Sequence, residues 1–263
     1  MSRLVIDVGG TWTRVGRAEG KKLVSHRVFK TPRQWRVARQ AFVLATGELF
    51  RGCKVKDVVI GLPGMFDGHR SILRRAPNLR GWEIYPIKRD LERIFQATVR
   101  LENDAALGAL GEATHGAGRG FAIVGYLTVG TGVGGARVVD QRIDRAGNSF
   151  EPGQKIVDAG HTLEQQIGGR SLAKRYRSQW PRLSVSQWNT VTKQLANGLT
   201  SLAVRWSPDI FVLGGSVVLK GKIRFDHLRP FLRQKLQSEP PKIRRSKLGD
   251  LSGLWGGAVS QAE

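Results

Sequence analysis

The apolar positions of the first half of the chain predict short buried strands that alternate with helices. Residues 4–6 form a continuous apolar run and residues 12–17 alternate between apolar and polar side chains, so both segments are typical of strands. Apolar residues recur at helical spacing over 33–50 and again after Pro86, which predicts two helices with one buried face each. Further strands of this half are predicted at 55–60 and 99–102.

The second half repeats the order of the first. Residues 121–129 predict a strand, residues 130–135 a glycine turn and residues 136–140 a returning strand. An amphipathic helix over 184–206 and a strand over 210–213 follow. Each half therefore opens with strand, glycine turn and strand, and later adds strands and helices. This order predicts an α/β fold of two lobes with a cleft between them.

Composition narrows the class of protein. Hydrophobic residues make up 40% and charged residues 24% of the 263 positions, which excludes a disordered tail protein, a collagen and a coiled coil. The most apolar run, 121–129, is too short to span a bilayer, and the first residues lack the apolar run of a signal peptide. We therefore expect a cytoplasmic protein without membrane contact. The single cysteine, Cys53, excludes an internal disulfide framework and a cysteine-cluster zinc site.

The net charge is strongly positive. Lys and Arg number 43 against 21 Asp and Glu, which gives +22 at pH 7, and such a surface attracts polyanions such as nucleic acid and polyphosphate. The basic residues gather at 33–39, 170–182 and 220–247. The first two groups have helical spacing, so solvated helix faces are the plain interpretation. No segment of the sequence resembles a nucleic-acid-binding module.

Each half carries a glycine turn with a threonine in or beside it. Residues 130–135 satisfy the G-x-G-x-x-G pattern, but a dinucleotide-binding fold needs a helix next and the following residues predict a strand. Tight glycine turns can instead present backbone N–H groups to an anion, so the two turns could bind a polyphosphate group. Asp7, just before the first turn, could hold Mg²⁺ through water. Two ordinary hairpins are the alternative.

Residues 7–14 and 127–135 resemble the two phosphate loops of the ROK family (repressors, open reading frames, kinases), which includes sugar kinases with the actin-like ATPase fold. Shorter motifs follow the family's order along the chain, at 61–64, 77–82, 102–105, 150–153, 213–216 and 254–258. The resemblance covers residues 4–259. It implies an α/β, two-lobed actin-like ATPase (ribonuclease-H-like) fold with an interlobe cleft.

The resemblance also implies how the chain divides. Residues 1–103 would form the N-terminal lobe, with the first phosphate loop and part of the sugar site. Residues 104–263 would form the C-terminal lobe, with the second phosphate loop and the nucleotide site. The last helix would pack back on the N-terminal lobe. We also expect a homodimer.

The activity implied by the resemblance is that of a glucokinase-like enzyme. It would use ATP and Mg²⁺ to phosphorylate a hexose hydroxyl, expected to be O6, with Asp104 as the catalytic base. Phosphoryl transfer needs mainly positioning and a carboxylate that takes the hydroxyl proton, and the helix dipole keeps an aspartate at a helix start ionised. The other interpretation of Asp104 is a plain N-cap.

Other activities remain open at this point. A polyphosphate-dependent glucokinase or an N-acetylhexosamine kinase would use the same motifs, and the basic surface would attract polyphosphate. A sugar-responsive, non-catalytic regulator is less favoured, because the first phosphate loop begins at residue 7 and leaves no room for a preceding DNA-binding domain.

The matched motifs imply the remaining site residues. Candidates for the sugar hydroxyls are Gly64, Asn78, Asn103, Glu151, Gln154 and Glu164. Candidates for the nucleotide and its phosphates are Asp7, Gly9, Gly10, Thr11, Arg14, Gly130, Thr131, Gly132, Gly214 and Gly215. Asp7 is also the candidate metal ligand.

One departure from the family concerns zinc. Many members carry Glu-x-Gly-His followed by a cysteine-rich zinc loop, whereas Gln154 stands at the histidine position of this chain. With a single cysteine in the sequence, we expect no structural zinc. A rival alignment places residues 158–161 at the Glu-x-Gly-His position, with Asp158 for the glutamate and His161 for the histidine.

Overall fold

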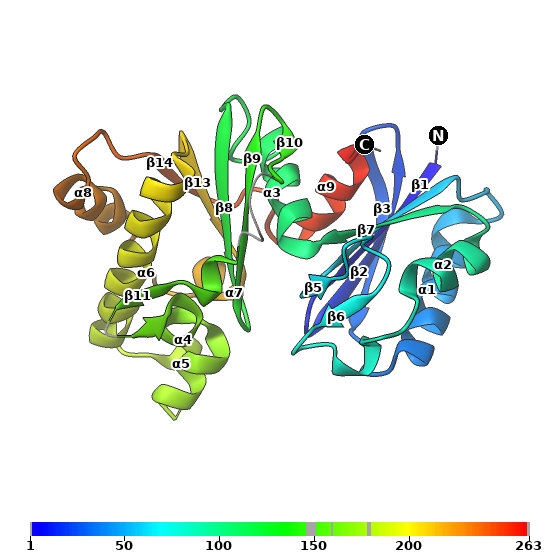
Figure 1. Cartoon of the computed structure of the whole chain (residues 1–263), viewed down its shortest axis with the longest axis horizontal. Helices are drawn as coiled ribbons and strands as arrows, with labels where there is room; N and C mark the ends of the chain where they lie inside the picture. Colours follow the sequence, from blue (N-terminus) through cyan, green and yellow to red (C-terminus); the bar gives the residue numbers. More distant parts are fainter. Residues whose placement is uncertain (1, 146–150, 159, 178–179, 262–263) are drawn as a thin grey trace. The chain divides into compact units, whose positions relative to one another are not determined.

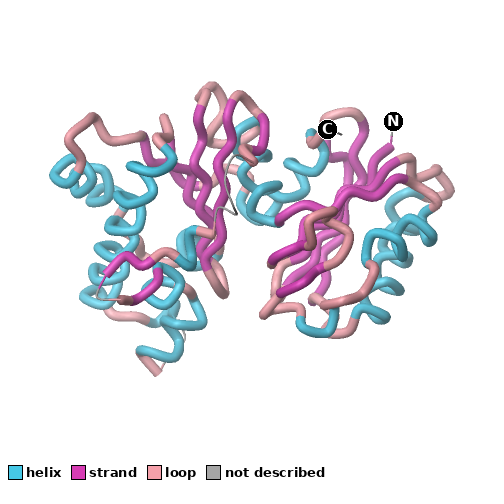
Figure 2. The backbone as a smooth tube through the Cα atoms, in the orientation of Figure 1, coloured by secondary structure: helices cyan, strands magenta, loops and turns pink. Residues whose placement is uncertain are grey.

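The computed structural model describes residues 2–145, 151–158, 160–177 and 180–261. The chain forms two compact units, of which the first comprises Met1–Gly111 and Leu251–Glu263 and the second Glu112–Asp250. Each unit combines one five-stranded sheet with helices, as the labelled cartoon in Figure 1 and the coloured tube in Figure 2 show. The α/β class predicted from the alternation of strands and helices is confirmed.

The sheet of the first unit brings three strand ends to one edge. Its strands, in sheet order, are β3 (Lys22–Lys30), β2 (Trp12–Glu19), β1 (Ser2–Val8), β4 (Asp57–Leu62) and β7 (Thr98–Asn103). β1 pairs antiparallel with β2 and parallel with β4, and β7 continues the sheet parallel to β4. The carboxyl ends of β1, β4 and β7 therefore meet, which is where ligands bind in open α/β sheets.

Helices cover both faces of this sheet, because successive residues of a strand point to opposite sides. α1 (Trp35–Phe50) and α2 (Ile87–Phe95) share a buried core with Leu4 of β1, whereas α9 (Ser252–Val259) shares a separate core with the neighbouring Val5. The other elements of this unit are β5 (Met65–Phe66), β6 (Leu73–Arg75), the 3-10 turn η1 (Arg80–Trp82) and α3 (Asp104–Thr114), whose last turn belongs to the second unit.

The second unit is built on a sheet of the same size. Its strands, in sheet order, are β10 (Arg142–Ile143), β9 (Val133–Val139), β8 (Ile123–Val129), β13 (Ile210–Gly214) and β14 (Lys242–Arg245). β8 and β9 are antiparallel and are joined by the second glycine turn, while β13 and β14 run parallel to β8. This arrangement places the end of β13 beside the glycine turn.

The long helix α6 (Val185–Trp206) supplies much of the core of the second unit. Its first turn is capped by Ser184 and Gln187, whose side chains each accept a backbone N–H from the other residue. Trp188 and Leu199 of α6 lie in one buried cluster with Leu213 of β13. The remaining elements are η2 (Pro152–Gln154), β11 (Ile156–Asp158), β12 (His161–Thr162), α4 (Leu163–Ile167), α5 (Gly169–Arg175), η3 (Trp180–Arg182), α7 (Ser216–Lys220), α8 (Phe225–Lys235) and η4 (Gly249–Leu251).

The first two turns of α3 pack within the first unit, and the two units divide after Gly111. A Cβ on Gly61 of β4 would lie only 2.9 Å from Leu107 Cδ1 of α3. One feature differs from the sequence analysis, which predicts no strand at β3, where Lys, His and Arg side chains interrupt the apolar alternation.

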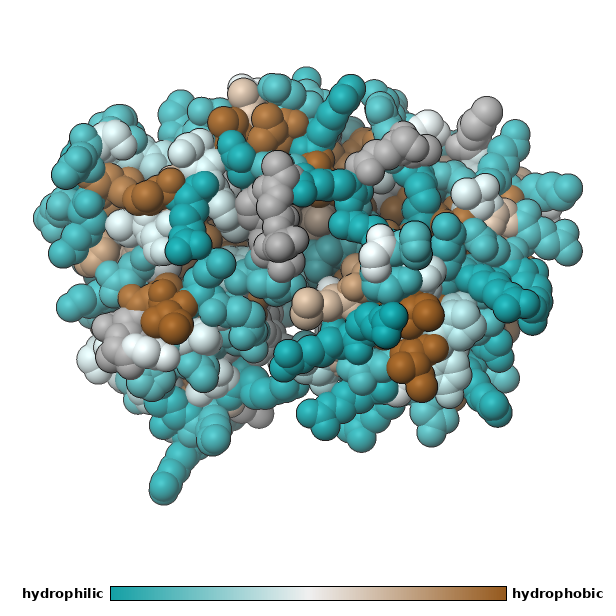
Figure 3. All heavy atoms as spheres, viewed as in Figure 1, coloured by the Kyte–Doolittle hydropathy of each residue, from teal (hydrophilic) through white to brown (hydrophobic). Residues whose placement is uncertain are grey.

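The surface agrees with the polar composition. Figure 3 shows one face of the molecule, on which hydrophilic residues predominate and apolar patches are small and separate. Within the described ranges, no helix combines the length and apolar character needed to cross a bilayer.

Candidate active site

Two carboxylates of the first unit flank a glycine at the carboxyl edge of the sheet. Asp7 of β1 pairs in register with Gly61 of β4, and Leu62 pairs with Asn103 of β7, which directly precedes Asp104. A Cβ on Gly61 would lie 3.7 Å from Asp7 Oδ1 and 3.3 Å from Asp104 Cα. The candidate base and the candidate metal ligand are therefore neighbours, separated by a residue that has no side chain.

The first glycine turn follows β1 and is braced by Thr31, the residue directly after β3. Gly9 N–H donates to Trp12 O at 2.9 Å, and the hydroxyl of Thr31 donates to Gly9 O at 2.7 Å. No acceptor within the described ranges takes the N–H of Gly10 or Thr11, and both residues are exposed. The turn therefore offers backbone donors of the kind that bind phosphate oxygens.

Asn78 lies against this turn. A Cβ on Gly10 would lie 3.1 Å from Asn78 Cβ, so a larger residue at position 10 would displace the amide. Gly64, another sugar candidate of this unit, has a φ of +118°, and a Cβ there would lie 2.3 Å from Arg75 O. Glycine is required at position 64 because L side chains rarely adopt that conformation and the backbone of β6 leaves no space.

The start of α3 separates the roles of Asn103 and Asp104. Asn103 Oδ1 accepts the N–H of Ala106 at 3.1 Å, which is the hydrogen bond of an N-cap. Asp104 Oδ1 accepts the N–H of Ala105 at 2.8 Å. Asn103, and not Asp104, is therefore the N-cap of α3, and Asp104 is the first residue of the helix itself.

Sequence analysis missed a buried carboxylate next to this pair. Glu102 is 5% exposed, accepts the N–H of Asn103 at 2.9 Å and forms an ion pair with Arg70. The signal that could have found it is a carboxylate that follows the buried Leu101 in β7 and directly precedes Asn103 and Asp104. Glu102 fixes the backbone from which α3 begins.

The second glycine turn is braced by two segments of its own unit. Gly130 N–H donates to Gly132 O at 2.9 Å, and Gly169 N–H at the start of α5 donates to Gly130 O at 2.8 Å. Glu164 Oε2 accepts the N–H of Val133 at 2.9 Å. A Cβ on Gly132 would lie 2.4 Å from this oxygen, so the carboxylate is packed directly on the turn.

The sugar candidates of the second unit lie close together. Gln154 is exposed in η2, where its N–H donates to Glu151 O at 3.1 Å, and η2 packs on α4, which carries Glu164. Burial raises the pKa of the Glu151 carboxyl above its usual range, and the negative charge of Glu164 raises it further. This group therefore contains two interacting carboxylates beside the second glycine turn.

The glycines that end β13 also touch this turn. Gly215 has a φ of +83°, and a Cβ there would lie 2.4 Å from Val129 O at the end of β8. A Cβ on Gly214 would lie 2.8 Å from the hydroxyl of Tyr126. The structure thus brings the nucleotide candidates of the second unit together, as it does those of the first.

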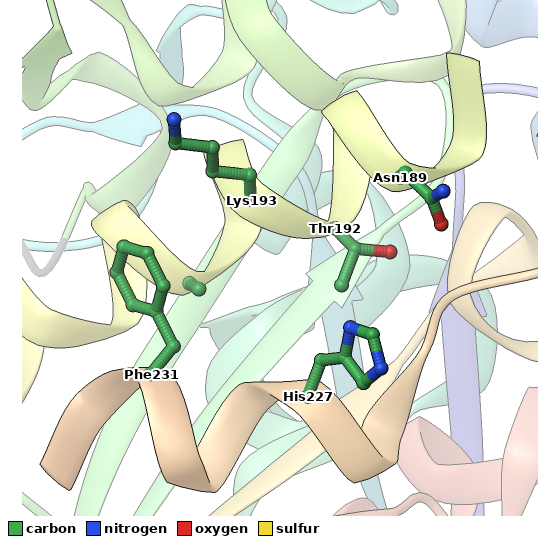
Figure 4. Close-up of a pocket in the computed structure, with 6 residues that line it drawn as sticks. Asn189, Thr192, Lys193, His227 and Phe231 are labelled. Atoms are coloured by element: carbon green, nitrogen blue, oxygen red, sulfur yellow. The ribbon is translucent and has the colours of Figure 1, made fainter. Parts of the chain in front are cut away.

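Other candidates stand apart from these groups. Of the rival alignment, His161 is exposed in β12, while Ala159 lies outside the described residues. Among the residues that the structure describes, no three His, Cys, Asp or Glu side chains form a metal cluster. A pocket of about 200 Å³ between α6 and α8 is lined by Asn189, Thr192, Lys193, Ala196, His227 and Phe231, and includes none of the predicted site residues (Figure 4).

Two α/β units, each with a braced glycine turn, define the class of sugar kinases and related proteins with the actin-like ATPase fold. The ROK family model matches residues 3–262, so the chain belongs to the ROK family. The chain is similar to the glucokinase of Streptomyces coelicolor, with 26% identity over 303 aligned positions that cover 96% of this chain and 95% of the relative.

Two solved structures agree with this assignment. The ROK hexokinase from Thermus thermophilus is 31% identical, with a TM-score of 0.85 and coverage of 98% of this chain and 97% of the other. A ROK family glucokinase from Streptomyces griseus in complex with glucose and AMPPNP is 25% identical, with a TM-score of 0.82 and coverage of 98% of both chains. These relatives support an enzyme of the sugar kinase class.

Proposed function

We propose that this protein transfers the terminal phosphoryl group of ATP to a hexose hydroxyl, with glucose as the first candidate and O6 as the acceptor. The relatives named glucokinase and hexokinase support the class of substrate, and the complex of the Streptomyces griseus enzyme with glucose and AMPPNP supports both ligands. The observation that carries the proposal is the placement of Asp104 and Asp7 on either side of Gly61.

Asp104 acts as the base in this proposal. Its carboxylate stands at the first residue of α3, where the helix dipole and the N–H of Ala105 stabilise the negative charge. An ionised carboxylate can accept the hydroxyl proton as the new phosphorus–oxygen bond forms. The hydroxyl oxygen then forms its bond to the terminal phosphorus of ATP as the bond from that phosphorus to the bridging oxygen breaks, and ADP leaves.

The other sugar hydroxyls would be bound by the polar groups that the family resemblance implies. In the first unit these are the amide groups of Asn78 and Asn103 and the backbone of Gly64. The oxygen of Asn103 already caps α3, so its amide nitrogen is the group that would donate to a hydroxyl. In the second unit the candidates are Glu151, Gln154 and Glu164.

The nucleotide phosphates would be bound by the two glycine turns. The N–H groups of Gly10 and Thr11, which no acceptor within the described ranges takes, would donate to phosphate oxygens, and Arg14 pairs in register with Asp7 on the adjacent strand. Asp7 fits an Mg²⁺ that is held by one carboxylate together with substrate phosphates and water. That ion would neutralise charge on the phosphates. Gly214 and Gly215 would let the rest of the nucleotide approach the backbone.

A coupled assay tests the proposal directly. Purified protein is incubated with a panel of glucose, mannose, N-acetylglucosamine and N-acetylmannosamine, each with ATP and Mg²⁺, and ADP release is followed. Phosphorus NMR of the product then identifies the phosphorylated position. We expect a hexose 6-phosphate. Absence of turnover with every sugar would refute the kinase assignment, and a phosphate on another hydroxyl would refute O6.

A further inference from the structure

The last helix of the chain lies along the face of β1 that carries the candidate metal ligand. Arg3, Val5 and Asp7 point to the same side of β1 because they are two positions apart. α9 packs on β1 and also touches β2, β3 and β4, and Figure 1 shows it beside β1 and β3. The first turn of α9 lies at Asp7, and its carboxyl end lies at Arg3.

Arg3 binds the carboxyl end of α9. Its Nη1 donates to Gly257 O at 2.9 Å, to Ala258 O at 3.0 Å and to Ser260 O at 2.7 Å. The last carbonyls of a helix have no partner within the helix and carry partial negative charge. One guanidinium therefore satisfies several of these groups and fixes where the helix ends.

Asp57 and Arg100 complete this clamp. Asp57 Oδ2 accepts from Arg3 Nε at 2.9 Å and from Arg100 Nη2 at 3.0 Å. Arg100 also donates to Ser260 O at 3.3 Å. The three charged side chains are 20–27% exposed, so water screens them only in part. They come from β1, β4 and β7, and thus tie α9 to three strands of the sheet.

Leu254 and Ala258 of α9 pack in a core with Val5, and three glycines of α9 approach their neighbours through backbone. A Cβ on Gly253 would lie 2.5 Å from Asp7 Cγ, and a Cβ on Gly257 would lie 2.2 Å from Val5 Cγ1. A Cβ on Gly256 would lie 1.8 Å from Leu107 O of α3. The partner of Gly256 is backbone, and the partners of Gly253 and Gly257 are the short side chains of Asp7 and Val5. A displacement of α9 would therefore displace Asp7 and α3 as well.

We propose that Arg3, Asp57 and Arg100 are positioning residues for phosphoryl transfer. They fix α9, and α9 fixes the carboxylate of Asp7 and the helix that begins with Asp104. The inference rests on the proposed function for the roles of Asp7 and Asp104. The clamp itself is a property of the fold and is measurable without any substrate.

The kinetic test uses Arg100→Met, which removes two donors of the clamp and leaves Arg3 in place. We expect kcat to fall about tenfold, because small misplacements of catalytic groups are costly, while KM for the sugar changes by less than about twofold. Arg100→Lys keeps the charge next to Asp57 and should restore part of kcat. The matched control is Arg27→Met, which breaks the exposed ion pair with Glu48 in the same unit and should leave kcat unchanged.

Hydrogen exchange supplies the second readout. In Arg100→Met, amides of residues 252–260 should exchange faster than in the wild type, and those of α1 should not. Gly253→Ala should lower kcat without faster exchange at the end of α9, because it moves Asp7 directly. Unchanged exchange in Arg100→Met would overturn the clamp, and faster exchange with unchanged kcat would overturn its positioning role. A wild-type chain without kinase activity would instead overturn the proposed function, while the exchange data would still decide on the clamp.

Discussion

Replacement of Asp104 by asparagine isolates the proton acceptor from everything else that the residue does. The carboxylate accepts the N–H of Ala105 at 2.8 Å, and an asparagine oxygen can accept the same hydrogen bond. Stability should therefore fall only by the lost charge near the helix start, about 0.3–1 kcal/mol. General-base catalysis contributes about 10²–10⁴ in rate, so the barrier should rise by about 3–5 kcal/mol.

The assay measures kcat, KM for the sugar and the thermal midpoint of Asp104→Asn. We expect kcat to fall by about the factor given above for general-base catalysis, KM to change little and the protein to remain folded. Asp226→Asn is the matched control, because Asp226 also lies in the first turn of a helix, α8, and its exposed carboxylate pairs with Arg224. Near-normal turnover by Asp104→Asn would refute the assignment of the base, and an equal loss in the control would show that the substitution acts through helix stability.

Three further predictions follow from single features of the fold. Glu151→Gln should raise the thermal midpoint at pH 8, because the pKa of Glu151 is raised in the folded state and its ionisation there opposes folding. This gain should vanish as the pH falls below the ordinary glutamate pKa of about 4.5, and a gain that persists in acid would contradict the prediction. Ile84 has a φ of +63°, which strains a residue with a side chain, and its side chain is 80% exposed, so Ile84→Gly should increase the free energy of unfolding in urea by about 1 kcal/mol. A decrease would show that the backbone conformation of Ile84 is not strained. If the basic residues of 220–247 form only a solvated face, polyphosphate should support no turnover at low or high salt, whereas a salt-sensitive polyphosphate rate would show that this surface guides a polyanionic donor.

The parts of the site that follow strands were predictable from the sequence. Asp7 comes directly after a buried apolar run, and Asn103 ends a strand that contains the buried Val99 and Leu101. Both therefore belong at strand ends, and parallel strands bring such ends to one edge. The glycine turns were predictable for the same reason, since apolar strands stand on both sides of each. The fold class and the family are confirmed, while the roles of the individual residues stay predictions.

Which of several neighbouring side chains makes which hydrogen bond was not predictable from the sequence. Asn103 and Asp104 are both good N-caps, and only the hydrogen bond from Ala106 shows which of them caps α3. Glu164 has the chemistry of a sugar ligand, yet one of its oxygens already accepts the N–H of Val133. Each of these outcomes depends on local geometry that two residue types can satisfy equally well.

The glycines of the last helix show where a sequence signal was present but could not be interpreted. Gly253, Gly256 and Gly257 lie inside α9, and a glycine within a helix costs about 0.5–1 kcal/mol relative to alanine. A chain that needed only a stable helix here would carry alanine. The structure gives the reason for each glycine, since a Cβ would collide with Asp7, Leu107 or Val5. Those partners are far away in the sequence, so the spacing of the glycines within α9 cannot identify them. The glycines thus lower the intrinsic stability of α9 but allow its close contact with β1, which carries Asp7, and with α3, which begins with Asp104. Arg3, Asp57 and Arg100 hold α9 in this position.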